Sequence, residues 1–331
     1  MNVLFIVGPT ATGKTALALE FASLLIAQGK RVYLLSADSK QAYSEQDIVT
    51  GKDKESLQSA VEKSDGKFSL FGIDVVKPHE EWSVAHFLTY VRMVVESARA
   101  DDAFLIVVGG TGMYVDAVVN PPQTASIVRD EKLRALLETK SVDELRQELK
   151  VIDPLKFDSM NESDSRNPRR LIRAIEVATH MGKGTPLRLS LAGQAGDVVQ
   201  RVFLQSDCLS WVGLDLPDDE LKKRIAQRVE ERIQQGAIEE TKTLLNDRGW
   251  TREARSAIGY EELIGYLFHK YSLETAKEMW ATNELAYVKR QRTWFKRHSA
   301  INWYSPTTET PIQKIAASIL DQFPLTSSEG N

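Results

Sequence analysis

The stretch that decides the fold is Val3-Leu4-Phe5-Ile6-Val7, followed at once by Gly8-Pro9-Thr10-Ala11-Thr12-Gly13-Lys14-Thr15. The second part, residues 8–15, matches the pattern GxxxxGK[ST], with an apolar strand-like run before it and a helical pattern after it. Its glycines let the backbone curl so that N–H groups point at phosphate oxygens, while Lys14 adds a charge and Thr15 offers a hydroxyl to Mg²⁺. We therefore expect this phosphate loop to bind a phosphate-bearing ligand. The pattern alone leaves open whether that ligand is a nucleoside triphosphate.

Length and composition limit the class of protein. The 331 residues suffice for one large domain or for a core with an inserted module. A net charge of −4 gives no overall sign of nucleic-acid binding, so any such surface must be local. The single cysteine, Cys208, excludes an internal disulfide framework and fits a reducing compartment. Because the chain has no apolar run of ~18 residues and no basic leader, we expect a cytoplasmic protein that does not use a membrane.

Strand-like and helix-like patterns alternate in the first third of the chain. Apolar runs predict buried strands at residues 3–7, 32–36, 104–108, 202–204 and 211–214. Such strands, separated by helices like the one expected at 83–100, indicate an α/β fold with a parallel sheet covered by helices on both faces. Because ligands bind beyond the carboxyl ends of these strands, Asp38 and Thr111 should share one cleft with the phosphate loop.

The character of the sequence changes after Pro121-Pro122. Strand-like runs stop, and residues 130–149 show the pattern of amphipathic helices. We therefore expect a discontinuous catalytic core at residues 1–120 and 167–305, a helical insertion at 121–166, and a polar tail at 306–331.

Basic residues gather in three places. Arg166, Arg169 and Arg170 lie where the insertion ends. Arg224, Arg228 and Arg232 follow at i, i+4 and i+8 of one helical pattern, for which the plain interpretation is a solvated charged stripe. Residues 289–297 interleave five basic side chains with Trp294 and Phe295, which is by itself a weak indication of nucleic-acid binding.

Taken together, these motifs resemble the tRNA dimethylallyltransferases. Eight blocks in the family's order carry the resemblance: GPTATGKT at 8–15, DSKQAY at 38–43, DIVTGK at 47–52, the Pro-Trp-Ser-Val-Phe element at 78–87, GGTGMY at 109–114, RLIRAIEV at 170–177, AIGYEE at 257–262 and KRQRTW at 289–294. The chain departs from the pattern at 70–72, where the family has a His pair, at 166–169, and at 284–286, where the family has T-R-Q. The resemblance implies a P-loop NTPase-like sheet with a helical insertion.

The resemblance also implies a reaction. The family transfers a dimethylallyl group from dimethylallyl diphosphate to N6 of the adenosine on the 3′ side of the anticodon in tRNA, and releases diphosphate. By resemblance, the phosphate loop holds the diphosphate with Mg²⁺ on Thr15, and Arg228 also binds it. Thr111 donates a hydroxyl to a diphosphate or bridging oxygen. Asp38 acts as general base toward the adenine amine.

The expected partners are dimethylallyl diphosphate and a tRNA anticodon stem-loop, bound by a monomer. The reacting base must leave its stack to reach the cleft. The turn at 38–41 should hold this base, and the basic segments should follow the phosphates. The residues expected to contact tRNA are Asp38, Ser39, Lys40, Gln41, Thr111, Arg134, Arg166, Arg169, Arg170, Lys289, Arg290 and Arg292.

Three other classes of protein share parts of this pattern. An ATP-dependent small-molecule kinase would have the same phosphate loop, but such kinases are shorter and do not need the block at 289–294. An RNA-binding module switched by a nucleotide would not need Asp38 at a strand end. An adenylate isopentenyltransferase acting on free nucleotide would not need the helical insertion.

Overall fold

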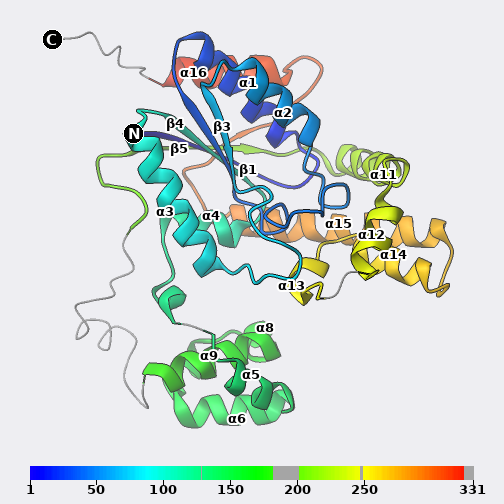
Figure 1. Ribbon diagram of the computed structural model, residues 1–331. Coiled ribbons are helices and arrows are strands. Elements are labelled where there is room, and N and C mark those ends of the chain that lie inside the picture. The colour runs from blue at the N-terminus through cyan, green and yellow to red at the C-terminus, as the bar shows by residue number, and fades with distance from the viewer. Residues whose placement is uncertain (128, 182–200, 247–248, 324–331) are drawn as a thin grey trace. The chain divides into compact units, whose positions relative to one another are not determined.

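The computed structural model describes residues 1–127, 129–181, 201–246 and 249–323 (Figure 1). The chain forms two compact units. The first combines Met1–Val119 with Val202–Asn331, and the second is Asn120–Arg201. Within the described ranges, no helix is both long and apolar enough to cross a bilayer.

The first unit is built on a six-stranded parallel sheet in the order β3-β2-β4-β1-β5-β6, which confirms the predicted α/β class. The strands are β1 (Asn2–Val7), β2 (Val32–Ser36), β3 (Phe68–Phe71), β4 (Phe104–Gly109), β5 (Cys208–Leu214) and β6 (Asn302–Tyr304). The apolar β1 lies between β4 and β5, with Val7 opposite Gly109 and Gly213. The phosphate loop therefore begins at the centre of the sheet's carboxyl edge.

The predicted strand at 202–204 is wrong. Val202 and Phe203 are buried, but they lie in a bend, and β5 begins only at Cys208. The apolar side chains fill the core beside Phe5, whose ring meets that of Phe203 edge-on at 5.9 Å between centroids. Burial, rather than strand pairing, explains this short apolar run.

Helices cover the sheet on both faces. Those of the first unit are α1 (Lys14–Ala27), α2 (Lys54–Lys63), α3 (Val84–Ala100), α4 (Gly112–Val119), α11 (Asp218–Gln234), α12 (Ala237–Asn246), α13 (Arg252–Arg255), α14 (Tyr260–Leu267), α15 (Leu273–Phe295) and α16 (Ile312–Gln322). On one face, α1 and α16 lie side by side over a core that includes Leu4, Ile6 and Ile106. On the other face, α3 and α4 pack on β4 (Figure 1).

The predicted polar tail at 306–331 is wrong in its first part. Residues 312–322 form α16, and Ile315, Ala316 and Ile319 are buried against α1 and the sheet. These apolar side chains recur at helical spacing between polar ones, so the average polarity of the segment conceals an amphipathic helix. The tail's last residues, 324–331, lie outside the described part.

The second unit is a small helical bundle. Its elements are the 3₁₀ turn η1 (Gln123–Ser126) and the helices α5 (Glu131–Glu138), α6 (Val142–Ile152), α7 (Pro154–Ser159), α8 (Glu162–Ser165) and α9 (Pro168–Met181). Leu171 and Ile175 of α9 share one apolar cluster with Leu137, Leu145 and Leu149. The insertion therefore extends beyond the predicted boundary at 166, because α9 supplies much of its core.

A charged cluster fixes α9 to α5. Both Arg134 Nε and Arg134 Nη2 donate to the Glu176 carboxylate at 2.8 Å, and Arg173 is paired with the same carboxylate. Burial of Glu176 would raise its pKa, but hydrogen bonds from Arg134, the Asp130 backbone and Arg173 outweigh burial and lower the pKa to about 2. Glu176 therefore stays ionised and holds the two arginines together.

Candidate functional site

The phosphate loop adopts the curled backbone that its glycines predict. Gly8 has φ +133°, and a Cβ built on it would lie 2.1 Å from the Leu214 carbonyl oxygen, so only glycine fits this passage. Gly13 caps the N-terminus of α1 in the left-handed region, and no side chain caps this helix end. Because side chains leave the first-turn amides of α1 uncapped, the helix start is suited to an anion.

A cavity of about 670 Å³ lies at the carboxyl edge of the sheet, and it is formed within the first unit. The ends of β1, β2 and β4 bring the phosphate loop, Asp38 and Thr111 to this one cavity, as the strand pattern predicts. Helix α11 adds Arg228. The predicted site residues that line the cavity are Thr10, Ala11, Gly13, Lys14, Thr15, Asp38, Ser39, Lys40, Gln41, Thr111, Arg228 and Arg290.

Two cationic side chains meet the phosphate loop. Lys14 Nζ donates to the Pro9 carbonyl at 2.5 Å. Arg228 Nη1 lies 3.1 Å from Thr10 Oγ1, and its Nη2 lies 3.4 Å from the Gly51 carbonyl oxygen. Burial and the nearby Arg228 charge lower the pKa of Lys14 to about 8. These two cations therefore repel each other until an anion lies between them.

The turn after β2 holds Asp38 by local bonds. Asp38 Oδ1 accepts from the Lys40 backbone N–H at 2.9 Å. Lys40 Nζ donates to the Glu253 carbonyl at 2.6 Å and to Ser256 Oγ at 2.7 Å, so its ammonium ties this turn to α13. Gln41 is held by Ser36, whose hydroxyl donates to Gln41 Oε1 at 2.8 Å. The carboxylate at position 38 is thus fixed by its own backbone turn.

Residues on α15 that the sequence did not single out also line the cavity. Tyr287 OH lies 3.5 Å from Thr111 Oγ1, and burial raises the pKa of Tyr287 above its usual value, so that it stays a neutral phenol. Gln291, inside the quoted block KRQRTW, accepts from the Thr10 N–H at 2.9 Å. The signal that could have found both was their four-residue spacing on one helix face.

Helix α11 also carries Arg232, an arginine for which the sequence predicts no role in the site. Arg232 is 5% exposed, and its Nη1 lies 3.5 Å from Glu284 Oε1. Burial and the Arg228 charge lower the pKa of Arg232 to about 9. The plain interpretation of this helix face as a solvated stripe is therefore wrong at Arg232, while Arg228 lines the cavity, where the resemblance places it.

The predicted basic contacts outside the cavity fall into two groups. Arg166, Arg169, Arg170 and Lys289 are exposed, although Arg166 is paired with Glu162 at 2.8 Å and Arg170 is paired with Asp164. Arg134 and Arg292 are half-buried and bound to carboxylates of their own unit. Arg292 donates from Nε and Nη2 to the Asp215 carboxylate at 2.9 Å and also meets Asp218, which points to a structural role in the first unit.

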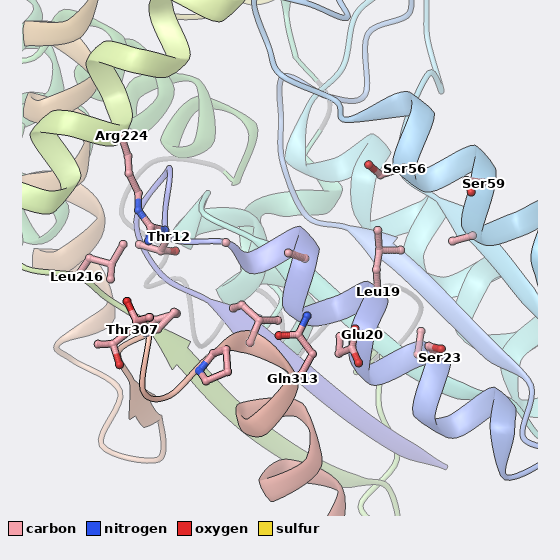
Figure 2. Close-up of a pocket in the computed structure, with 18 of the residues that line it drawn as sticks. Thr12, Leu19, Glu20, Ser23, Ser56, Ser59, Leu216, Arg224, Thr307 and Gln313 are labelled. Atoms are coloured by element: carbon pink, nitrogen blue, oxygen red, sulfur yellow. The ribbon is translucent and has the colours of Figure 1, made fainter.

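A second cavity of about 1000 Å³ lies between α1, α2 and the start of α16. Figure 2 shows Thr12 and Arg224 at one end of it, and Ser56 and Ser59 of α2 at the other. Lys14, Asp38 and Thr111 are not among the described residues that line it. Its larger volume therefore does not make it the reaction site.

The donors around the phosphate loop fit a shared Mg²⁺ site. The described residues contain no group of three His, Cys, Asp or Glu side chains that could enclose a metal. The cavity does offer hard oxygen donors, the Thr15 hydroxyl and the Asp38 carboxylate. Mg²⁺ commonly takes one or two protein oxygens and completes its shell with phosphate and water.

Comparisons with known proteins agree with this geometry. Residues 41–298 match the family model described as IPP transferase. The chain is 33% identical to a tRNA dimethylallyltransferase of Anoxybacillus flavithermus, over 96% of this chain and 95% of that protein. It is 34% identical to one of Alkaliphilus oremlandii, over 97% of both chains.

A solved structure shows the same fold. The full-length tRNA isopentenylpyrophosphate transferase of Bacillus halodurans superimposes with a TM-score of 0.64 at 29% identity, covering 97% of this chain and 96% of its own. The match therefore extends over nearly the whole length of both chains. This chain is therefore a member of the IPP transferase family, among the tRNA dimethylallyltransferases.

Proposed function

We propose that this protein transfers a dimethylallyl group from dimethylallyl diphosphate to N6 of the adenosine on the 3′ side of the anticodon in tRNA. The observation that carries the proposal is the single cavity that brings together the phosphate loop, Asp38, Thr111 and Arg228 in a chain of this family. We place the enzyme in the cytoplasm as a monomer.

The diphosphate of the donor lies on the phosphate loop. The amides at the start of α1 and the Lys14 ammonium face its oxygens, and Arg228 approaches from α11. The Thr15 hydroxyl would hold Mg²⁺ here, and the ion would supply further neutralisation of the leaving group. Positive groups placed where negative charge grows on the leaving diphosphate lower the barrier to its departure.

The transfer breaks one bond and forms another. The allylic C1–O bond breaks with its electron pair going to diphosphate, and the adenine N6 forms a bond to C1. The N6 proton then passes to the Asp38 carboxylate, which acts as general base. Thr111, at the end of β4, donates its hydroxyl to an oxygen of the diphosphate. The end of β2, which carries Asp38, therefore serves the adenine, and the end of β4 serves the diphosphate.

The tRNA binds through local basic groups, because the whole chain is acidic. Arg166 at the end of α8, and Arg169 and Arg170 at the start of α9, are exposed. Lys289 and Arg290 on α15 are exposed as well. Phosphate contacts from such side chains fix the register of an RNA without reading its sequence. The target adenine enters the cavity by leaving its stack, and the turn at Asp38 receives it.

A product assay tests this function. The protein is incubated with dimethylallyl diphosphate and Mg²⁺ together with unmodified tRNA, AMP or ATP, and the products are analysed by mass. We expect a mass increase of one dimethylallyl group on tRNA alone, and much slower accumulation of this product with the Asp38→Asn variant. Prenylation of AMP or ATP instead of tRNA would favour a free-nucleotide enzyme, and steady ATP turnover would favour a kinase.

A further inference from the structure

One face of α15 lies against the two loops that hold the donor. Tyr287, Gln291 and Trp294 are spaced i, i+4 and i+7, so they project from the same side of the helix. Opposite them lie the phosphate loop and the turn between β4 and α4, which carries Thr111. The three side chains thus connect two loops that are about a hundred residues apart in the sequence.

Gln291 bridges the two loops with one amide group. Its Oε1 accepts from the Thr10 backbone N–H at 2.9 Å, and its Nε2 donates to the Gly110 carbonyl at 2.9 Å. The partners fix the orientation of the amide, since a backbone N–H can only donate and a carbonyl can only accept. Gln291 is 4% exposed, so water does not offer an easy replacement for either bond.

The glycines of the β4–α4 turn make room for this helix face. A Cβ on Gly110 would lie 2.2 Å from Gln291 Nε2, and one on Gly112 would lie 2.2 Å from the Trp294 ring. Trp294 Nε1 also donates to Asp116 Oδ2 at 2.8 Å, and Tyr287 OH lies 3.4 Å from the Gly110 carbonyl oxygen. The turn and α15 are therefore fitted to each other around Thr111.

We propose that Gln291 is a positioning residue that fixes the phosphate loop relative to Thr111. This inference rests on the proposed function, because it assigns Thr111 and the loop to the two ends of one diphosphate. The Thr10 amide is already bonded to Gln291, so it is held as part of the frame and does not face the ligand. Without the bridge, the half-buried Thr10 N–H loses its bond to Gln291, the buried Gly110 carbonyl keeps only the longer contact with Tyr287 OH, and each loop relaxes separately.

The test uses two substitutions of similar size. Gln291→Met removes both hydrogen bonds. Gln291→Glu keeps the shape and the acceptor for the Thr10 N–H, but its carboxylate cannot donate to Gly110 unless it is protonated. We expect kcat to fall by about 10²-fold in both, since misplacement of reacting groups by about 1 Å has effects of this size. The KM for tRNA should stay within twofold of wild type.

The pH profile separates positioning from mere support of the fold. The protonated acid of Gln291→Glu has the same donor and acceptor pattern as the amide, so its activity relative to wild type should rise as the pH falls from 8 to 6. The relative activity of Gln291→Met should stay flat. In a Thr111→Ala background, Gln291→Met should have little further effect, because the bridge acts through Thr111.

Matched substitutions at a second glutamine control for the change of side chain itself. Gln58 is an exposed glutamine on α2, and Gln58→Met and Gln58→Glu should leave kcat and its pH profile unchanged. The inference would be overturned if both Gln291 variants kept a kcat near that of the wild type. It would also be overturned if the relative activity of Gln291→Glu did not change with pH and the effects of Gln291→Met and Thr111→Ala on kcat were fully additive. Either result would leave the proposed function intact. Absence of tRNA prenylation by the wild-type protein would instead overturn the proposed function. Gln291→Glu keeps the test decisive if Gln291→Met does not fold.

Discussion

The basic start of α9 and the basic end of α15 carry the same kinds of side chain but face different surroundings. At the start of α9, Arg169 and Arg170 are exposed on the surface of the second unit, where Arg170 is paired with Asp164. At the end of α15, Arg292 is bound to Asp215 and Asp218, and Gln291 and Trp294 face the donor loops. Segments of similar composition therefore differ in their surroundings: one is exposed and is proposed to contact RNA, whereas the other also packs against the loops of the candidate site.

Substitution of Asp38 is expected to give the largest effect, a loss of transfer rate. Asp38→Asn removes the proposed base without changing the size of the side chain, and a general base contributes about 10²–10⁴-fold in rate. Single-turnover transfer to tRNA should therefore slow by about that factor, while tRNA affinity changes less than threefold. A single-turnover rate within threefold of wild type would remove Asp38 from this role.

Arg292 tests whether the end of α15 is structural. Arg292→Gln leaves Asp215 without its cation, and we expect the free energy of unfolding to fall by about 2 kcal/mol, the range for hydrogen bonds to charged groups. Thermal unfolding would measure this loss. The exposed Lys289→Gln on the same helix is the matched control, and it should change stability by less than about 0.5 kcal/mol. Equal stability of the two variants would contradict the structural role.

Substitutions at the start of α9 test whether its exposed arginines contact RNA. The double variant Arg169→Gln/Arg170→Gln should bind all tRNAs more weakly, by about tenfold, and lower the slope of log affinity against log salt by roughly two, one for each lost phosphate contact. Filter binding at several salt concentrations measures both. Affinity for dimethylallyl diphosphate serves as the internal control and should not change. An unaltered salt slope would mean that these arginines do not touch RNA.

The smallest expected effect is a pH dependence of donor affinity that comes from the lowered pKa of Lys14. Burial and Arg228 lower its pKa to about 8 in the free protein, so the ammonium is lost as the pH rises through that value. Because diphosphate prefers the charged form, donor affinity should fall about fourfold between pH 7 and pH 8.5, with a proton taken up on binding. Calorimetric titration in buffers of different ionisation enthalpy measures both. Lys14→Arg should make the affinity independent of pH over this range.

The lowered pKa of Lys14 also makes the stability of the fold depend on pH. Folding disfavours the charged form of Lys14, so at pH 7, where the folded and unfolded states are both protonated, the whole unfavourable contribution is present. As the pH rises from 8 toward 10.5, the folded state loses its proton first, and the contribution of Lys14 becomes less unfavourable. Donor affinity and the stability contribution of Lys14 should therefore change in opposite directions above pH 8.

Most of the sheet could be predicted from the sequence because its central strands are long and apolar. β1, β2, β4 and the end of β5 are continuous apolar runs, and their carboxyl ends bring together the loop, Asp38 and Thr111. By contrast, β3 has one fully buried residue, Phe68, and β6 has only three residues, so neither carries a readable pattern. Helix α16 was missed because its buried positions are diluted by polar neighbours.

The bridging role of Gln291 could not be predicted, for a different reason. The helical spacing of Gln291 and Tyr287 could indicate a shared face, but it does not tell which groups Gln291 binds, and its partners Thr10 and Gly110 lie far away in the chain. Only the pairing of β1 with β4 and the direction of α15 bring the three together. The same holds for Arg232, whose partner Glu284 comes from another helix. Residue types predict which chemistry is available, but long-range packing decides which residue supplies it.

The position of β1 in the sheet has a consequence for synthesis of the protein. β1 emerges from the ribosome well before β5, yet Asn2 pairs with Cys208 of β5, and the whole second unit is made in between. At about 5–20 residues per second, the edge of β1 that will meet β5 waits roughly 10–40 s for its partner. During that interval the nascent chain exposes one of its most apolar segments, while the helical insertion, whose contacts are local, can already fold. Chaperone demand should therefore peak just before β5 leaves the exit tunnel.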